Sequence, residues 1–198
     1  MTPQVVLASQ SGTRKALLQG AGVAFAAVSS GVDEDAVKRE LLAQAATPRE
    51  IAGALAERKA LRISAGRPEY VIGADQTLEL EGRLYDKVAT LDEARERLAL
   101  LRGRTHRLEA AVVVAKSGAV IWRETATATL TMRVFSDAFL QQYLAREGDD
   151  VLSSVGCYRL EGLGAQLFSH IDGDYFAILG LPMLGLLELL RGEGVLTA

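Results

Sequence analysis

The chain has 198 residues, of which 49% are hydrophobic and 24% charged, enough apolar material for one buried core. Its net charge of −3 argues against a protein that binds nucleic acid through bulk positive charge, and its single cysteine, Cys157, excludes an intramolecular disulfide and fits a reducing cytoplasm. We therefore expect one cytoplasmic domain over residues 1–198, without a nucleic-acid polymer as partner.

The first third of the chain predicts alternating strands and helices. The clearest start signal is a capping box formed by Thr47 and Glu50, with Pro48 in the first helical turn. The expected elements, in order, are a strand over residues 5–9, a helix that contains Leu17 and Leu18, a strand over residues 23–29, and helices over residues 33–44 and 47–65.

The middle of the chain predicts a buried strand that ends at an acidic residue. Residues 70–74 are mostly apolar and run directly into Asp75, where we expect the strand to end. A hairpin over residues 78–84 follows, and a second capping box at Thr90 begins a helix over residues 90–103.

The second half of the chain predicts a long antiparallel hairpin. Residues 108–115 and 119–134 are both strand candidates, and threonines alternate with apolar residues in the second of them. The remaining expected elements are a helix over residues 137–146, an irregular glycine-bearing loop over residues 148–164, a short strand over residues 166–168 and a helix from Pro182. Together the elements predict a mixed α/β fold.

We expect no signal peptide and no membrane partner. The first apolar run covers only residues 5–8, and the apolar stretch at residues 178–190 is interrupted by two glycines, a proline and a glutamate.

The turn at residues 9–15 is the first candidate for ligand binding. Small residues let backbone amides approach a ligand, and Arg14 and Lys15 add positive charge to a helix N-terminus, which suits a phosphate. Ordinary strand-to-helix turns have the same composition, and the spacing is neither a Walker loop nor a dinucleotide fingerprint. Both interpretations stay open at this point.

Asp75 is the second candidate. An acid at the carboxyl end of a buried strand lies where α/β sheets place their binding crevices, although a turn-forming aspartate is an equally ordinary interpretation. Taken singly, Glu34, Lys59 and Lys87 are typical of solvated surface charges, and the two histidines are more typical of structural positions.

Taken together, ordered blocks along nearly the whole chain resemble the Maf family of nucleoside triphosphate pyrophosphatases. The matching blocks are Leu7-Ala8-Ser9-Gln10-Ser11 with Arg14, Leu55-Ala56 with Lys59-Ala60, Ile72-Gly73-Ala74-Asp75, Lys87, Gly103-Arg104-Thr105-His106, Gly156-Cys157-Tyr158 with Glu161-Gly162 and Gly164, Ile171-Asp172-Gly173-Asp174-Tyr175, and Gly180-Leu181-Pro182. Many blocks in the same order make coincidence a poor explanation.

The resemblance implies a mixed, twisted sheet flanked by helices, two lobes around a central cleft, and a homodimer. It also implies hydrolysis of a nucleoside triphosphate to the monophosphate and pyrophosphate, with a divalent cation, Mg²⁺ or Mn²⁺, as cofactor. The roles it assigns are Asp75, Lys59 and Lys87 for catalysis, Ser9, Ser11, Thr13, Arg14, Gln76 and Glu161 for substrate binding, and Glu34 and Asp75 for the metal.

Two positions favour the branch of the family that resembles 7-methyl-GTP pyrophosphatases. That branch carries Asp-Gln at the catalytic strand and a glutamate before the loop glycine, as Gln76 and Glu161 do here, where dTTP/UTP pyrophosphatases carry threonine and glutamine. A glutamate accepts hydrogen bonds from the N1–H and amino group of guanine, a pattern that uracil and thymine do not offer.

One position departs from both branches. Thr13 stands where the 7-methyl-GTP branch has tryptophan and the other has arginine, and Gly12 replaces the family's proline, so a stacking platform for a cationic base is missing there. A dTTP/UTP or broad-range nucleoside triphosphate pyrophosphatase therefore stays open, as does a catalytically weak nucleotide-binding regulator of cell division.

Overall fold

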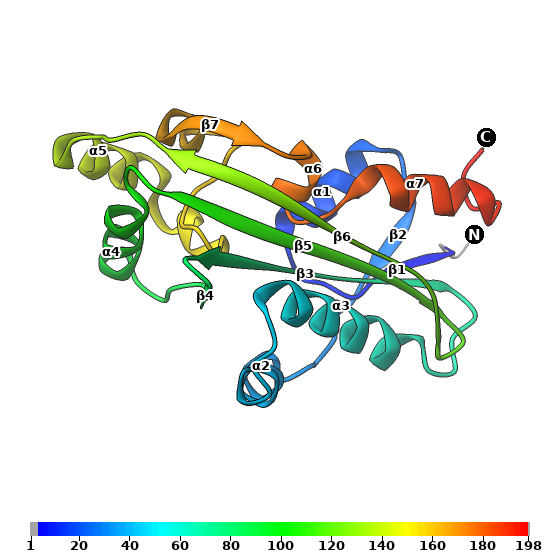
Figure 1. The fold of residues 1–198 in the computed structure, drawn as a ribbon. Coiled ribbons are helices and arrows are strands. Elements are labelled where there is room, and N and C mark those ends of the chain that lie inside the picture. Colours follow the sequence, from blue (N-terminus) through cyan, green and yellow to red (C-terminus); the bar gives the residue numbers. More distant parts are fainter. Residues whose placement is uncertain (1–3, 198) are drawn as a thin grey trace.

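A seven-stranded mixed sheet organises the fold in the computed structural model, which describes residues 4–197 (Figure 1). The strand order is β2-β1-β3-β5-β6-β7, with β4 paired to β3. Strands β2, β1 and β3 are parallel and all other pairs are antiparallel. The strands are β1 (Val5–Leu7), β2 (Phe25–Ala27), β3 (Tyr70–Leu80), β4 (Arg83–Tyr85), β5 (Thr105–Lys116), β6 (Ala119–Met132) and β7 (Phe168–Asp172).

Helices flank this sheet, as the sequence predicts (Figure 1). Helices α3 and α2 lie on one side, whereas α1, α6 and α7 lie on the other, and α4 and α5 lie near the far end of the long strands (Figure 1). The helices are α1 (Gly12–Gly20), α2 (Glu34–Ala43), α3 (Pro48–Ser64), α4 (Leu91–Leu101), α5 (Asp137–Glu147), α6 (Tyr175–Ile178) and α7 (Met183–Gly192), with the 3₁₀ helices η1 (Gly148–Ser153) and η2 (Leu163–Leu167).

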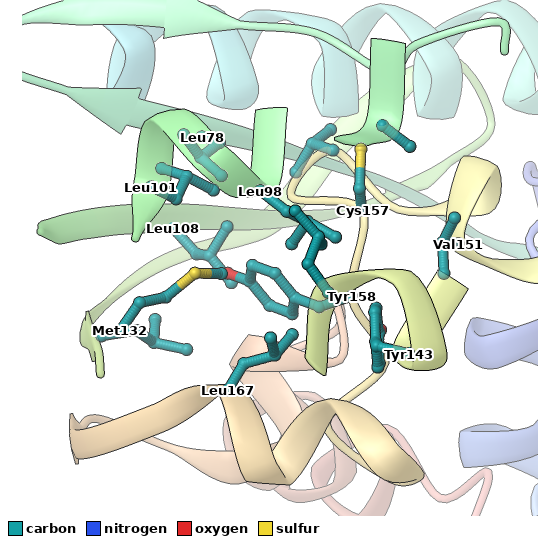
Figure 2. Close-up of a cluster of buried hydrophobic side chains, with 14 of the residues drawn as sticks. Leu78, Leu98, Leu101, Leu108, Met132, Tyr143, Val151, Cys157, Tyr158 and Leu167 are labelled. Carbon is teal, nitrogen blue, oxygen red and sulfur yellow. The ribbon is translucent and has the colours of Figure 1, made fainter. Parts of the chain in front are cut away.

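Two large hydrophobic clusters lie at opposite ends of β3 and β5. The first joins the start of β3 to α1 and α7 through residues such as Ile72, Leu18 and Leu186. The second joins the end of β3 to α4 and α5 through residues such as Leu78 and Leu98, and Figure 2 shows its leucine, methionine and tyrosine side chains. This division supports two lobes that share one sheet.

The predicted helix starts are confirmed. Both capping boxes form, because the Thr47 and Thr90 side chains accept from the backbone amides of Glu50 and Glu93 while those glutamates bind back to the cap backbone. Each capping box gives a hydrogen-bond acceptor to backbone amides that have none within the helix, so the local sequence alone sets where α3 and α4 begin.

The predicted end of the strand before Asp75 is wrong. Strand β3 continues to Leu80 because β5 pairs with it from Val71 to Glu79, and this long-range pairing outweighs the polar residues. On its other side, β3 pairs with β1 only as far as Ile72 and with β4 from Leu78. Asp75 therefore lies inside β3, between residues 72 and 78, where one edge of this strand has no neighbouring strand.

Several boundaries in the second half also differ from the prediction. Strand β5 begins at Thr105 rather than at residue 108, because Thr105 and His106 pair with Thr131 and Leu130 of β6. The strand expected at residues 166–168 lies at Phe168–Asp172, and η1 and η2 occupy parts of the loop expected at residues 148–164. Among residues 4–197, no helix is both long and apolar enough to cross a membrane.

Candidate active site

A cleft of about 1090 Å³ opens where β3 has no neighbouring strand. Its lining includes Leu108, Tyr158 and Ile178, which belong to or pack in the second hydrophobic cluster, and Leu17, which packs on the first. The residues to which the family resemblance assigns a role all line it: Ser9, Ser11, Thr13, Arg14, Glu34, Lys59, Asp75, Gln76, Lys87 and Glu161. Lys15 is not among the lining residues and instead donates to Gln10 at the surface.

A buried ammonium group joins two carboxylates at the centre of this cleft. Lys59 of α3 donates to Asp75 of β3, with 2.6 Å between Nζ and Oδ1, and its Nζ lies 2.6 Å from Oε1 of Glu34 on α2. Lys59 and Asp75 are only 5% and 6% exposed, whereas Glu34 is partly open to solvent. Buried charges require such partners, so three separate elements are tied together at this point.

The close approach of α3 to β3 brings Lys59 to Asp75. Gly73 lies two residues before Asp75, and therefore on the same face of the strand. A Cβ atom at Gly73 would lie 2.1 Å from the carbonyl oxygen of Ala56, so only glycine allows the helix backbone to lie this close. Thr77, two residues beyond Asp75, donates to the carbonyl of Pro48 and fixes the start of α3.

Arg14 lies at the open edge of β3, where it links three segments. Its Nη1 donates to the carbonyl of Ala74 at 3.0 Å, and its Nε donates to the carbonyl of Gly180 at 2.8 Å. The same Nη1 lies 3.3 Å from the Ser9 hydroxyl, and Ser11 caps α1 by accepting from the Arg14 amide. The turn at residues 9–15 thus brings two features to the cleft, the Arg14 guanidinium, which these hydrogen bonds fix in place, and the N-terminus of α1.

Gln76 points to the opposite face from Asp75. Its Nε2 donates to the carbonyls of Ala177 and Ile178, at 2.9 and 3.0 Å. Its amide nitrogen therefore holds the end of α6 in place, and its Oε1 is the atom that remains for a ligand. Gln76 thus orders part of the cleft wall as well as lining it.

Glu161 lines the cleft beside Arg159, where other carboxylates also gather. Its Oε1 lies 3.5 Å from Nε of Arg159, whose Nη1 also pairs with Asp150 at 2.6 Å and lies 3.6 Å from Glu147. Three carboxylates thus surround one guanidinium. Asp150 and Arg159 line the cleft but were not predicted from the sequence, because only the fold brings η1 beside this loop.

A second cation of α2 also lines the cleft. Lys38 pairs with Asp86, which directly precedes Lys87 in the loop after β4. Lys38 follows Glu34 by four residues, so helical spacing places both on one face, a signal that sequence reasoning missed. Lys87 itself lies in the exposed part of the cleft wall.

The two central carboxyls titrate in opposite directions. Burial raises the pKa of Asp75, against the lowering effect of Lys59 and Arg14. Burial also acts to raise the pKa of Glu34, but Lys59, Lys38 and Lys87 outweigh it and lower that pKa below its ordinary value. When the pKa values of two carboxyls are shifted in opposite directions, the one with the raised pKa suits a proton acceptor and the one with the lowered pKa suits a permanently charged group.

The same carboxyls are compatible with a divalent cation. Across residues 4–197, no cluster of three or more His, Cys, Asp or Glu side chains forms a complete metal site. Mg²⁺ is commonly held by one or two carboxylates plus substrate phosphates, however, so a full protein cage is not needed. Glu34 and Asp75 supply two carboxylates close together, since one oxygen of each lies 2.6 Å from Nζ of Lys59.

The protein has an open mixed sheet, and one cleft at its edge places Arg14, Lys59 and Lys87 around the buried Asp75. Such a group of cations is typical of α/β proteins that bind an anionic ligand. The chain belongs to the Maf family: the model of that family, described as Maf-like protein, matches residues 4–193.

The similar proteins are named as pyrophosphatases that act on nucleotides. The chain is 60% identical to a nucleoside triphosphate pyrophosphatase of Caulobacter vibrioides, over 100% of this chain and 98% of that protein. It is 49% identical to a protein of the same name from Granulibacter bethesdensis (98% and 99% covered) and 47% identical to a 7-methyl-GTP pyrophosphatase of Rhizobium meliloti (100% of both). The predicted family, and the prediction that the chain is an enzyme, are confirmed.

Proposed function

We propose that the chain hydrolyses a nucleoside triphosphate to the nucleoside monophosphate and pyrophosphate. The observation that carries this proposal is the buried Glu34–Lys59–Asp75 arrangement in a cleft that also contains Arg14 and Lys87. The names of its close relatives support the same activity.

Asp75 acts as the proton acceptor in this reaction. A water oxygen bonds to the α-phosphorus, the bond from that phosphorus to the α,β-bridging oxygen breaks, and pyrophosphate leaves with the bonding electron pair. Asp75 takes the proton of the water, a role favoured by the pKa that burial raises. Lys59 holds the Asp75 carboxylate in place during this transfer.

The cations of the cleft bind the phosphate chain. Arg14, Lys59 and Lys87 are positioned around the same space, where their charges offset the negative charge that develops on the leaving pyrophosphate. Ser9, Ser11 and Thr13 line the cleft at the N-terminus of α1, which adds partial positive charge.

Mg²⁺ or Mn²⁺ is the proposed cofactor, and Glu34 and Asp75 would hold it. Such an ion supplies Lewis-acid chemistry toward phosphate oxygens when bound. The lowered pKa of Glu34 keeps this carboxyl charged, as a metal ligand requires.

The acidic end of the cleft supports 7-methyl-GTP as the substrate. Glu161 and Asp150 outnumber Arg159 among the charged residues that line this part of the cleft, so a cationic base is favoured there over a neutral one. Glu161 also has the acceptor pattern for the guanine edge. The relative from Rhizobium meliloti carries this substrate in its name.

A broad-range or dTTP/UTP pyrophosphatase is the second candidate. Thr13 favours it, because this position offers no aromatic platform for a methylated base. The more similar relative from Caulobacter vibrioides is named without a specific base. A nucleotide-binding regulator with little turnover is the third candidate, and nucleotide binding without hydrolysis would favour it.

The proposal also includes one catalytic domain that forms a homodimer in the cytoplasm, as the family resemblance implies. Light scattering of the eluting peak in size-exclusion chromatography tests the dimer, whose predicted mass is twice the 21.2 kDa of the chain.

Pyrophosphate release from a panel of triphosphates tests the activity and its substrate. The panel contains 7-methyl-GTP, GTP, UTP, CTP, dTTP and ATP, each with Mg²⁺, with Mn²⁺ and with EDTA. We expect metal-dependent release that is fastest from 7-methyl-GTP. Preference for pyrimidines would favour the second candidate, and no release from any nucleotide would contradict the proposed activity.

A further inference from the structure

A buried histidine makes one side-chain hydrogen bond, to a tyrosine of the cleft wall. Nε2 of His106 lies 2.7 Å from the hydroxyl oxygen of Tyr158, and the two residues are 1% and 4% exposed. Within residues 4–197, the other ring nitrogen of His106, Nδ1, is buried without a hydrogen-bond partner. Among residues 4–197, the bond to Tyr158 is therefore the one hydrogen bond that fixes this imidazole ring.

The loop formed by residues 154–162 is built around Tyr158. A Cβ atom at Gly156 would lie 2.2 Å from the Tyr158 ring, so the ring occupies space that only glycine leaves open. Cys157, between them, has a φ of 59°, a left-handed conformation that is unfavourable for a residue with a side chain. A loop holds such a conformation only when its contacts stabilise it, and the bond from His106 is one of those contacts.

Tyr158 packs in the hydrophobic core and also lines the cleft. Figure 2 shows Tyr158 among the leucine and methionine side chains of the second hydrophobic cluster, and its ring packs edge-on against Phe168, with 4.9 Å between centroids. Tyr158 also lines the cleft, and so do Arg159 and Glu161, which follow it in the same loop. Tyr158 therefore connects the core to the loop that carries Glu161, which is held in addition by Arg97 at Val155 and by Asp150 at Arg159.

We propose that His106 is a positioning residue for base recognition: by holding the hydroxyl of Tyr158, it sets the place of the loop at residues 154–162 and of Glu161 within it. This inference rests on the proposed function, because it takes the Glu161 end of the cleft as the place of the base. It concerns binding of the base alone, since Arg14, Lys59 and Lys87 come from other elements.

Two probes separate positioning of the base from general stability. Calorimetry measures binding of 7-methyl-GTP, GTP and UTP, and of inorganic triphosphate, which has the phosphate chain without the base. All titrations are done in EDTA, so that binding is recorded without turnover. Thermal unfolding of each variant is measured in parallel.

Removing the bond from either side is expected to weaken base-dependent binding alone. His106→Leu and Tyr158→Phe should each reduce affinity for the preferred nucleotide by roughly tenfold, with less than about a twofold change for inorganic triphosphate. Because both variants remove the same bond, the double variant should lose no more than either single one. His106→Gln keeps a donor and an acceptor near Tyr158 and should recover part of the loss.

Tyr70→Phe is the matched control. Tyr70 is a second buried tyrosine, it belongs to the first hydrophobic cluster, and its hydroxyl bonds to Glu193 and Lys116, outside the loop at residues 154–162. The same chemical change there should leave nucleotide affinity unaltered.

Three results would overturn the inference. These are equal losses for nucleotides and inorganic triphosphate, unchanged nucleotide affinity in both bond-breaking variants, and a wild-type protein that binds no nucleotide. If the wild type binds nucleotides but releases no pyrophosphate, the proposed function fails, while the affinity ratios still support or overturn the role of His106.

Discussion

Glu161 makes the clearest prediction at the scale of single residues. Glu161→Gln replaces an acceptor-only group by one that also donates, so it removes charge from the base end and leaves the Lys59 and Asp75 end untouched. We expect kcat/KM for 7-methyl-GTP to fall roughly tenfold to a hundredfold, with a change below about threefold for UTP. Steady-state kinetics on both substrates measures this, and equal losses on both would argue against a base-reading role.

Titration of His106 makes a second residue-scale prediction. Burial lowers its pKa from the ordinary 6.5 to about 4. Between these values the unfolded chain binds the proton and the folded chain does not, so the free energy of unfolding falls as pH is lowered from about 6.5 to 4. The loss amounts to roughly 3 kcal/mol.

Urea unfolding at several pH values, for wild type and for His106→Gln, measures this pH-dependent loss in the free energy of unfolding. The difference between the two proteins removes contributions of other groups, such as Asp75, whose raised pKa acts in the opposite sense. The wild type should lose more stability than the variant over this interval. Parallel pH profiles would show that His106 is not the buried neutral group described.

At the scale of elements, the contact between α3 and β3 decides whether the site forms. Gly73→Ala forces a methyl group against the Ala56 carbonyl, so α3 has to move away and Lys59 with it. We expect a loss of at least about 3 kcal/mol in stability and a large loss of activity, measured by urea unfolding and pyrophosphate release.

Gly53→Ala is the control at this scale, because Gly53 lies in α3 itself and a Cβ there meets nothing within 4 Å. That variant should gain roughly 0.5–1 kcal/mol from the higher helix propensity of alanine. Similar stability of the two variants would contradict the argument that backbone proximity at Gly73 brings Lys59 to Asp75.

The elements also show what the sequence predicts and what it does not. Capping boxes at Thr47 and Thr90 fixed two helix starts because capping is a local interaction. The end of β3 was misplaced because pairing with β5 extends the strand through Asp75, whose partner in the register is Ala111. Strand ends of this kind depend on partners that no local pattern reveals.

At the scale of the whole molecule, the predicted site residues converge on one cleft, although Glu34, Lys59 and Lys87 are typical of ordinary surface charges when taken singly. Their convergence was predictable only from the resemblance of ordered blocks to a known family. The bond between His106 and Tyr158 was not predicted because it joins residues 52 positions apart, and Arg159 was not predicted because only the fold brings η1 beside its loop. Lys38 was missed although its helical spacing from Glu34 was a local signal.

The two parts of the cleft carry different charged groups. The first part has four cations, Arg14, Lys38, Lys59 and Lys87, and four carboxyls, Glu34, Asp35, Asp75 and Asp86, whereas in the second part Asp150 and Glu161 outnumber Arg159. A divalent cation at Glu34 and Asp75, as proposed above, would make the first part positive, so that a nucleotide with an anionic phosphate chain and a cationic base would suit both parts.

Pyrophosphate release by Asp75→Asn is the most direct test of the central claim. Asparagine has the same shape but accepts no proton, and Lys59 keeps Glu34 as its partner, so the fold and nucleotide binding should persist. We predict a fall in kcat of at least about a thousandfold, whereas Asp137→Asn, which breaks the ion pair with Arg102 outside the cleft lining, should retain normal turnover. Near-normal turnover by Asp75→Asn would contradict the account.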